Sequence, residues 1–428
     1  MMKNDCFAMS KYLVLFLLCV FSVTDCLAQM QEIKSKSVAS LQVVAGNEWL
    51  KIPCILLGGD RKVNISFDHL SHDARRYTYT VTHCEPDWSD SDGLLTSDYI
   101  SGFQTGLYIE DYKTSVNTNQ LYTHYSLTIP NADCRIRTSG NYRVDIIDEE
   151  DDDTVASVRF MVYENLVAVA KEIKDNTDID YQRSHQQLEL RVQYPLSINC
   201  ISPREQFKVA VMQNGRTDNM VWCPPAPQLL ANALVWKHTP ELIFPAGNEY
   251  HNFEILDVDL NSFGVESIDW DGEWYHVHLY HDYPRRAYVF ENDANGAFLL
   301  RNSDNYESET TSEYVRVHFY YDSPERLPGD VYLSGRWATD GDRQTYLMAY
   351  DEESGCYQAE ITMKYGYYSY QYLLLPDGEE ENVGVGKQPY SKTFMTEGDF
   401  YQTENDYLVL AYYRTPADRT WRLVGIGE

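Results

Sequence analysis

The amino-acid sequence predicts an all-β protein built from tandem β-sandwich domains of the immunoglobulin or fibronectin type. Aromatic residues make up 14% of the chain, including 35 tyrosines, and aromatic side chains pack well on pleated sheets. Short apolar–polar alternations recur along the chain, which is the period expected of half-buried strands. Gly, Pro, Asn and Asp separate these segments at short intervals, as in sandwich folds. The overall content of 43% hydrophobic residues is sufficient for the cores of several domains.

Residues 1–28 are expected to be a cleaved secretory signal peptide. Lys3 and Lys11 give a basic start, and the apolar run at 12–23 is too short to span a bilayer comfortably. Cys26-Leu27-Ala28 then ends in a small residue, which suits cleavage after Ala28. No later segment has the roughly 18 continuous apolar residues of a transmembrane helix. The mature chain is therefore expected to be exported and to have no direct membrane span.

The first domain is expected over residues 29–163. In segment 77–83, Tyr and Val side chains alternate with Thr, which predicts a strand. Pro86 ends this strand because proline has no N–H to donate. A second alternating strand is predicted at 122–129. Later strands follow at 142–146 and 158–162, and an acidic hairpin tip is expected between them at 148–153.

The second domain is expected over residues 164–306. Asn214-Gly215 is a strong hairpin turn, since both residue types tolerate positive φ. Residues 228–236 are predicted to form one short helix. Alternation of apolar and polar residues predicts strands at 188–192, 207–211 and 275–279.

The third domain is expected over residues 307–428, and its first residues, 307–312, are expected to be a polar linker. Leu333-Ser-Gly-Arg-Trp337, followed by Gly366-Tyr-Tyr-Ser-Tyr370, resembles the glycogen- or starch-binding E-set modules attached to amylase-type enzymes. In such modules aromatic rings stack on sugar, which makes Trp337, Tyr368 and Tyr370 alternative sugar-stacking candidates. Packing inside the sandwich explains the same rings equally well. We favour packing, because function belongs to sites and not to folds.

The net charge of −30 excludes nucleic acid and anionic lipid headgroups as main partners, since such a surface repels both. It is compatible with basic partners and with neutral sugars. The sequence contains no Gly-x-Ser-x-Gly elbow, no phosphate-cradling glycine-rich loop and no His-Glu-x-x-His pattern. It therefore favours a binding protein over an enzyme, and we assign no catalytic residue and no cofactor.

Histidines and cysteines are the residues that could bind a metal ion or form disulfides. His276, His278 and His281 form a His-x-His-x-x-His pattern, and His276 and His278 share one face of a predicted strand. Half-buried strand histidines are more often structural, so no metal site is assigned. The mature chain would contain six cysteines, whose pairing a sequence cannot determine. Cys200 and Cys223 are the favoured local pair.

Several linked motifs resemble the type IX secretion system plug protein family of Bacteroidetes. They are Tyr77-Thr-Tyr-Thr-Val-Thr-His-Cys-Glu-Pro-Asp-Trp88, Asp98-Tyr-Ile-Ser-Gly-Phe103, Tyr122-Thr-His-Tyr125, Ser139-Gly-Asn-Tyr142, Gln213-Asn-Gly-Arg216 and Thr403-Glu-Asn-Asp-Tyr407. The resemblance covers nearly all of the mature chain. It implies a non-enzymatic periplasmic protein, associated with the outer membrane, that binds and occludes the periplasmic opening of the large outer-membrane β-barrel translocon.

The partner-contact candidates are Tyr99, Phe103, Tyr108 and Tyr112, which lie in the aromatic stretch of the first domain. Exposed tyrosines suit an interface that must release, because the ring is apolar and its tip polar. Burial should decide whether each ring packs the core or faces a partner. We expect Trp88 in the core and the loop 102–112 to be exposed. The alternative function is a cell-envelope carbohydrate-binding protein that uses the third domain to bind a glycan.

Overall fold

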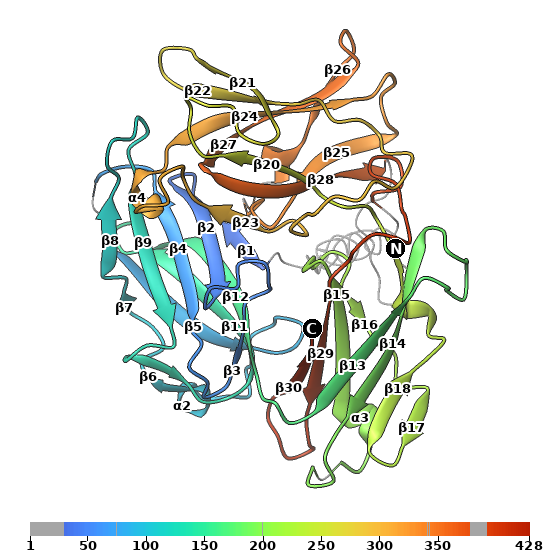
Figure 1. Cartoon of the computed structure of the whole chain (residues 1–428). Coiled ribbons are helices and arrows are strands. Elements are labelled where there is room, and N and C mark those ends of the chain that lie inside the picture. The colour runs from blue at the N-terminus through green and yellow to red at the C-terminus, as the bar shows by residue number, and fades with distance from the viewer. Residues whose placement is uncertain (1–29, 74, 199, 340, 342, 377–391) are drawn as a thin grey trace, which may run out of the picture.

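The computed structural model describes residues 30–73, 75–198, 200–339, 341, 343–376 and 392–428. The expected signal peptide at 1–28 lies outside these residues. The described chain is almost entirely β and folds into three two-layered sandwiches that meet at the centre of the molecule (Figure 1). In that view the first sandwich lies at the left, the second at the lower right and the third at the top. The predicted all-β class with tandem sandwiches is confirmed.

The first sandwich comprises residues from Met30 to Tyr163. Its strands are β1 (Gln31–Ile33), β2 (Val38–Ala45), β3 (Cys54–Leu56), β4 (Val63–His69), β5 (Tyr77–Cys84), β6 (Ile100–Gly102), β7 (Leu107–Tyr108), β8 (Asp111–Thr114), β9 (Thr123–Ile129), β10 (Cys134–Ile136), β11 (Gly140–Asp148) and β12 (Asp153–Tyr163). One sheet has the order β1-β12-β11-β5-β7, with β3 beside β12, and the facing sheet has the order β2-β4-β9-β8. A short helix, α2 (Thr96–Tyr99), precedes β6, which pairs with β10.

The predicted central strand is β5, and its alternation has the expected cause. Tyr77, Tyr79 and Val81 are buried in the core between the two sheets, while the intervening threonines are half-buried on the other face. The predicted acidic tip also forms, between β11 and β12. Arg75 holds it, with its guanidinium 2.8 Å from carboxylate oxygens of both Asp148 and Asp151. The period-2 pattern of β5 thus determines which residues face the core, and Arg75 fixes the tip of the β11–β12 hairpin.

The second sandwich contains β13 (Ala168–Lys174), β14 (His185–Gln193), β15 (Phe207–Gln213), β16 (Val221–Trp222), β17 (Gln228–Leu230), β18 (Ala233–Trp236), β19 (Ile243–Pro245), β29 (Tyr407–Tyr413) and β30 (Arg422–Gly427), with the short helices α3 (Pro203–Gln206) and η1 (Pro240–Leu242). Its sheets have the orders β13-β14-β18-β17 and β16-β15-β29-β30, and β19 pairs with β14. The predicted turn at Asn214-Gly215 is present, with φ of 53° and 69°.

The helix predicted at 228–236 is wrong, because this segment is the hairpin β17–β18. All four residues of β18 are buried, and the strand pairs with β14 in the sheet. A short apolar run fits a buried strand as well as a helix, so periodicity alone does not separate them. The pairing with β14, more than 40 residues earlier in the chain, selects the strand.

The third sandwich contains β20 (His251–Ile255), β21 (Val265–Trp270), β22 (Tyr275–Leu279), β23 (Phe298–Leu300), β24 (Tyr314–Asp322), β25 (Gly329–Ser334), β26 (Ala349–Asp351), β27 (Cys356–Lys364) and β28 (Gly366–Pro376), with α4 (Ser308–Thr311) and η2 (Arg343–Tyr346). Its sheets have the orders β21-β22-β24-β27-β26 and β20-β28-β23, and β25 pairs with β28. Within the first of these sheets, β22 and β24 run parallel.

The sheets do not follow the expected division into 164–306 and 307–428. Strands β20 and β23 pair with β28, so segment 251–300 belongs to the third sandwich. Strands β29 and β30 return to pair beside β15, so segment 407–427 completes the second sandwich. We propose that the units are 30–163, 164–249 together with 407–428, and 250–376. Sheet pairing between distant segments, which local patterns do not encode, determines these limits.

The first and third sandwiches are joined through a buried charge cluster. The Lys364 ammonium lies 2.7 Å from Asp68 Oδ2, and both side chains are fully buried. The hydroxyl of Tyr314 donates to the same oxygen, and His124 Nδ1 lies 2.6 Å from Asp68 Oδ1. Burial alone would raise the pKa of Asp68, but Lys364 and His124 outweigh it and hold that pKa below its usual range. The cluster keeps its charges paired inside the junction.

The first and second sandwiches share a separate hydrophobic cluster. It joins three residues of the first sandwich to the outer face of the sheet that carries β15, β29 and β30: Met30, Cys54, Met161, Ala210, Met212, Leu408, Leu410, Tyr412, Trp421 and Leu423. The Tyr412 hydroxyl also donates to Asn141 Oδ1 at 2.9 Å across the junction. Both junctions are packed as domain interiors are, so the three sandwiches form one body.

All six cysteines of the described residues are free thiols, so the expected Cys200–Cys223 disulfide is not formed. Both residues pack at the edge of the core of the second sandwich, where they act as small apolar side chains. The other four are buried. Burial raises the pKa of Cys134 to about 11 and that of Cys84 to about 12, which keeps these thiols protonated and unreactive at neutral pH.

Candidate interaction surface

The aromatic stretch of the first sandwich runs along an open edge of the fold. Strand β7 is the last strand of one sheet and β8 the last strand of the facing sheet, and the chain passes directly from one to the other. In Figure 1 both strands lie at the left margin of the molecule. Edge strands present unpaired backbone N–H and C=O groups that can bind another chain. This edge combines such groups with exposed rings.

Three of the four predicted contact residues are exposed on this edge. The exposed fractions are 66% for Phe103, 44% for Tyr108 and 50% for Tyr112. Two of these rings are also held in place: Arg76 lies 4.4 Å above the Tyr108 ring, and Tyr112 stacks on the buried Tyr125 at 5.5 Å. Rings that are fixed before binding lose little conformational entropy in a complex. We call Phe103, Tyr108 and Tyr112 the edge patch.

Tyr99, the fourth predicted contact residue, is buried and belongs to the core of the first sandwich. Its ring lies 5.7 Å from His83 and 6.3 Å from Tyr142. It is therefore not presented to a partner. The reason is its position at the end of α2, where the polypeptide turns inward before β6.

The position of Phe103 depends on the glycine before it. Gly102 has a φ of +121°, and a Cβ atom there would lie 2.0 Å from the carbonyl oxygen of Asp133. Only glycine permits this close approach between β6 and the chain before β10. The backbone N–H of Phe103 then donates to the same carbonyl at 2.8 Å. The loop can therefore display the ring of Phe103 without disturbing the sheet.

Trp88 is half-buried and lies between sandwiches instead of within a single core. Its ring packs against the hydrophobic cluster that joins the first and second sandwiches, and the guanidinium of Arg159 lies 5.2 Å from it. The loop 102–112 is exposed along most of its length, as expected, although Ile109 is buried in the core. The family motif around Trp88 therefore stabilises the junction.

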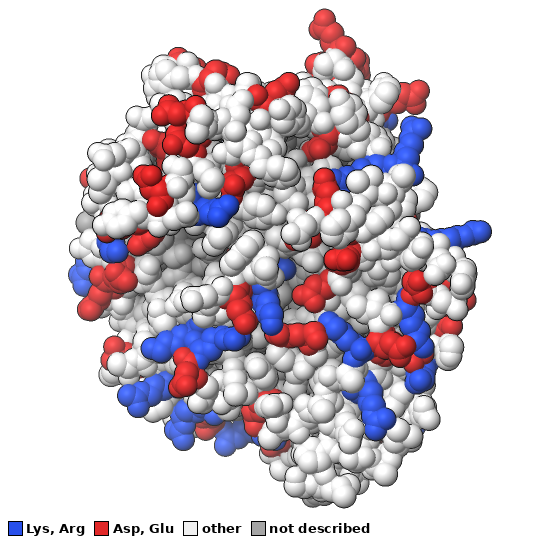
Figure 2. Space-filling model, in the orientation of Figure 1, with Lys and Arg blue, Asp and Glu red and all other residues white. Residues whose placement is uncertain are grey.

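The charges on the visible face are distributed unevenly. Figure 2 shows acidic side chains gathered over the third sandwich at the top, and several basic ones at the lower left, over the first sandwich. The first sandwich has exposed basic residues near β6, including Arg135 and Arg137. Arg419 also reaches this end, where it pairs with Asp98 at 3.0 Å. A protein of net charge −30 thus has a locally mixed surface next to the edge patch.

The sugar-stacking candidates of the third sandwich lie inside its core. Trp337, Tyr368 and Tyr370 are all buried, and the Trp337 indole N–H donates to the Ser369 carbonyl at 3.0 Å. The Tyr370 hydroxyl donates to Asp282 at 2.7 Å. These contacts use the polar tips of the rings as well as their faces. The rings pack the sandwich, which is the interpretation that the sequence favoured.

The three histidines of the His-x-His-x-x-His pattern do not meet one another through their ring nitrogens. His278 is held by Tyr320 and Asp269, and His281 by Asp322. His276 instead contacts His318 of β24, with 2.8 Å between Nδ1 and Nε2. Sequence reasoning missed His318. Val315, Val317 and Phe319 alternate along β24, so His318 lies on the other face of that strand. The pairing of β24 with β22, which brings His318 to His276, is not visible in the sequence.

A cavity of about 230 Å³ lies where the three sandwiches meet. Asp218 in its lining is already paired, since it lies 2.7 Å from Arg216 and 3.1 Å from Lys392. Burial would raise the pKa of Asp218, but Arg216 and Lys392 outweigh it and hold that pKa well below its usual range. Such a carboxylate stays ionised and is a poor general acid or base near neutral pH. The cavity therefore belongs to the junction between the sandwiches.

Comparison with known proteins identifies the family. Residues 38–164 match the family model described as "Type 9 secretion system plug protein 1st domain". A crystal structure of a hypothetical protein from Parabacteroides merdae is 33% identical and superimposes with a TM-score of 0.86, covering 94% of this chain and 98% of that one. A search of curated proteins finds no match.

The similarity to the Parabacteroides merdae protein extends over all three sandwiches, and the family match spans the first. Among the described residues, no helix has the length and apolar character needed to cross a membrane. The match to this family and the all-β fold indicate a non-enzymatic, envelope-associated component of this secretion system. The chain belongs to the type IX secretion system plug protein family.

Proposed function

We propose that this protein is periplasmic and binds the periplasmic opening of the large outer-membrane β-barrel translocon of the type IX secretion system, which it occludes. The observation that carries the proposal is the family match over residues 38–164, the sandwich on which the edge patch lies. The signal peptide expected at 1–28 would deliver the chain to the periplasm.

The construction of the molecule suits this role. A plug must resist deformation across a wide opening, and three sandwiches joined by a buried ion pair and a hydrophobic cluster supply a broad, stiff body. A plug must also leave when cargo arrives. A modest interface with tyrosines and mixed charges releases more readily than a large apolar one. The edge patch and the mixed charges beside it have this composition.

The edge patch is proposed to make the contact with the barrel. Phe103, Tyr108 and Tyr112 are exposed, and aromatic rings often dominate the binding energy of an interface. They lie on or beside edge strands, whose free backbone groups can pair with an extended segment of the partner. The proposed contact is thus a combination of strand pairing and ring burial.

Capture from native outer membranes tests both parts of the proposal. Tagged mature protein should co-purify with a large outer-membrane barrel. The triple variant F103A/Y108A/Y112A should capture at least about tenfold less of it, because several anchor residues are lost together. The matched control is Y280A/Y283A/F290A, which removes three rings of similar exposure from the third sandwich.

The outcomes separate the claims. If the unaltered protein captures no barrel, the proposed function fails. If it does, but the edge-patch variant captures as much barrel as the control variant, the function stands and the edge patch is the wrong surface. Circular dichroism of both variants should match that of the unaltered protein, since all six rings are exposed.

A further inference from the structure

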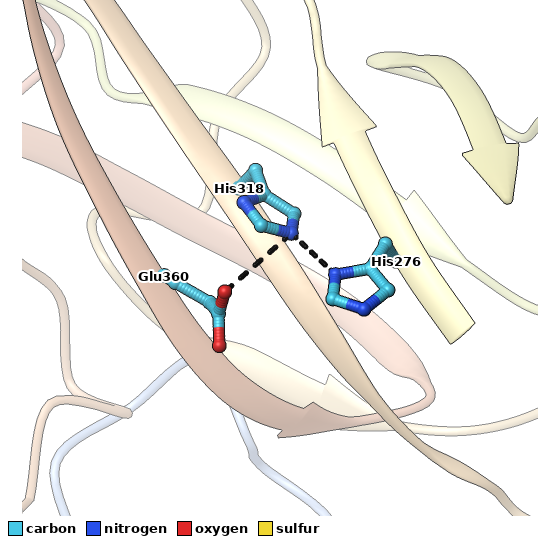
Figure 3. Close-up of side chains that lie close together, drawn as sticks. All are labelled: His276, His318 and Glu360. Carbon is cyan, nitrogen blue, oxygen red and sulfur yellow. Dashed lines mark hydrogen bonds and ion pairs between the residues drawn. The ribbon is translucent and has the colours of Figure 1, made fainter. Parts of the chain in front are cut away.

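One cluster of side chains on the third sandwich has no part in the proposed function. It lies on the outer face of the sheet β21-β22-β24-β27-β26, away from both junctions described above. His276 comes from β22, His318 from β24 and Glu360 from β27, three neighbouring strands of this sheet (Figure 3). Their apolar neighbours Val277, Val317 and Ile361 point to the opposite face, into the core. The cluster is therefore assembled by strand register.

We propose that His276, His318 and Glu360 form a binding site for a divalent transition-metal ion of the zinc type. One ligand atom of each residue lies within 4.8 Å of those of the other two. His318 Nε2 lies next to both His276 Nδ1 and Glu360 Oε2. Two imidazoles and one carboxylate are a donor set that zinc accepts readily, with a fourth position left for water or another ligand.

The distances suit an ion of this size. Tetrahedral zinc with ligands at about 2.0–2.2 Å holds the ligand atoms roughly 3.3–3.6 Å apart. In the structure His276 Nδ1 lies 2.8 Å from His318 Nε2, and His318 Nε2 lies 3.8 Å from Glu360 Oε2. The first of these distances must lengthen and the second shorten by a few tenths of an ångström to reach this spacing. Small side-chain rotations can supply such changes.

Surrounding residues orient the ligands. Asp271 accepts from His276 Nε2 at 3.1 Å, which places the proton of the neutral ring there and leaves the lone pair on Nδ1. Backbone N–H groups of Glu273 and Trp274 donate to Asp271 Oδ1 at 2.7 and 2.8 Å, which leaves Oδ2 to accept from His276. Arg316 lies 3.2 Å from Glu360 Oε1 and leaves Oε2 directed toward His318.

The hydrogen bond between the two imidazoles also prepares His318 to act as a ligand. Its Nε2–H donates to His276 Nδ1 when no ion is bound. Binding moves this proton to Nδ1 and exposes the Nε2 lone pair, with no change in the charge of the ring.

Neighbouring groups of the same types are less suited to metal binding, and one of them supplies a control. His278 stacks on His318 at 4.5 Å, but both of its nitrogens are engaged, by Tyr320 and Asp269. A second group contains His281, Asp322 and Cys356. There burial and a hydrogen bond with Asp322 raise the pKa of Cys356 to about 12, so its thiolate is scarce at neutral pH.

Titration of the full mature chain with ZnCl2, followed by calorimetry under reducing conditions, tests the site. The expected result is saturable binding of one equivalent, weakened at least about tenfold in H276A, H318A and E360Q. H281A should bind as the unaltered protein does. Glu360 is largely exposed and its replacement by glutamine is isosteric, so E360Q keeps the test valid if a histidine variant fails to fold.

Three results would overturn the proposal. They are the absence of saturable zinc binding, binding that H318A and E360Q leave unchanged, and equal loss of binding in H281A. Titration with Co²⁺ gives an independent readout of the ligands. A visible spectrum of tetrahedral type without a thiolate charge-transfer band supports the proposed ligands, whereas a thiolate band would assign the ion to a cysteine and contradict them.

Discussion

At the scale of single residues, the contact between the first and third sandwiches depends on Asp68 and Lys364. Both side chains are fully buried, and Asp68 accepts from three groups: Lys364, Tyr314 and His124. A buried charge is tolerated only when it is paired and hydrogen-bonded. Losing one partner leaves the other as an uncompensated charge in the junction.

Replacing Lys364 with methionine should therefore lower the free energy of unfolding by about 3–5 kcal/mol. Urea denaturation followed by tryptophan fluorescence measures this change. Lys113→Met is the matched control, since Lys113 joins the same two sandwiches through an exposed pair with Glu309 and should cost less than about 1 kcal/mol. Similar losses in the two variants would contradict the role given to the buried pair.

His251 gives the stability of the third sandwich a defined pH dependence. It lies between Asp282 and Glu397, with nitrogen–oxygen distances of 2.9 and 3.0 Å, and Arg285 lies beside it. Burial lowers the pKa of His251, but the two carboxylates outweigh burial and raise that pKa to about 10. A pKa above the unfolded value of about 6.5 means that stability is present below pH 6.5 and is lost as the pH rises toward 10.

His251→Asn should remove this contribution. The difference in free energy of unfolding between the unaltered protein and H251N is expected to be larger at about pH 6 than at about pH 10. Urea denaturation at the two pH values measures it, and the comparison cancels groups that titrate in both proteins. A difference that stays constant or grows with pH would show that His251 is not held protonated by its neighbours.

At the scale of the elements, the second sandwich depends on strands from the end of the chain. β29 is central in the sheet β16-β15-β29-β30, and it supplies Tyr407, Val409 and Tyr413 to the core. Without it, β15 loses its partner along seven residues. The second sandwich is thus completed only after the third has been traversed.

Truncation after Asp406 should unfold the second sandwich and leave the first folded. Limited proteolysis is expected to cleave rapidly within 164–249 while a fragment close to 30–163 persists, because the core of the first sandwich contains residues of that segment alone. Mass spectrometry of the fragments identifies the sites. Equal resistance of 164–249 with and without the last strands would contradict the proposed limits of the units.

The same elements show what could be predicted from the sequence. Strands with clear alternation, such as β5, β9 and β22, are predicted near their observed places because burial of one face requires that pattern. The hairpin β17–β18 is not predicted, because its mostly apolar segment 228–236 shows no period-2 alternation. The return of β29 to the second sandwich was also missed, because strand pairing over about 200 residues leaves no local mark.

The residues of the candidate sites divide in the same way, into those that local sequence predicts and those that only the fold brings together. Exposure of Phe103, Tyr108 and Tyr112 agrees with a loop rich in glycine and polar residues. Tyr99 is buried instead because of its position at the end of α2, which its residue type does not reveal. The pattern His276-x-His278 drew attention to the correct strand. Its partners His318 and Glu360 are 42 and 84 residues further along, and only the register of β22, β24 and β27 brings them to His276.

At the scale of the whole molecule, the junctions make one body out of three sandwiches. The first sandwich contacts the third through Asp68 and Lys364 and the second through the cluster around Met161 and Tyr412. The Parabacteroides merdae structure shares this fold across 94% of the chain, in agreement with a fixed arrangement. Under the proposed function, this body covers the opening as a unit and presents one edge of the first sandwich to it.

Closure of the translocon by this body can be measured as ionic conductance. The purified barrel is reconstituted in a planar bilayer, and current is recorded before and after mature protein is added to the periplasmic side. We expect a large fall in conductance that the Y280A/Y283A/F290A variant reproduces and F103A/Y108A/Y112A does not. Unchanged conductance at protein concentrations that saturate binding would contradict it.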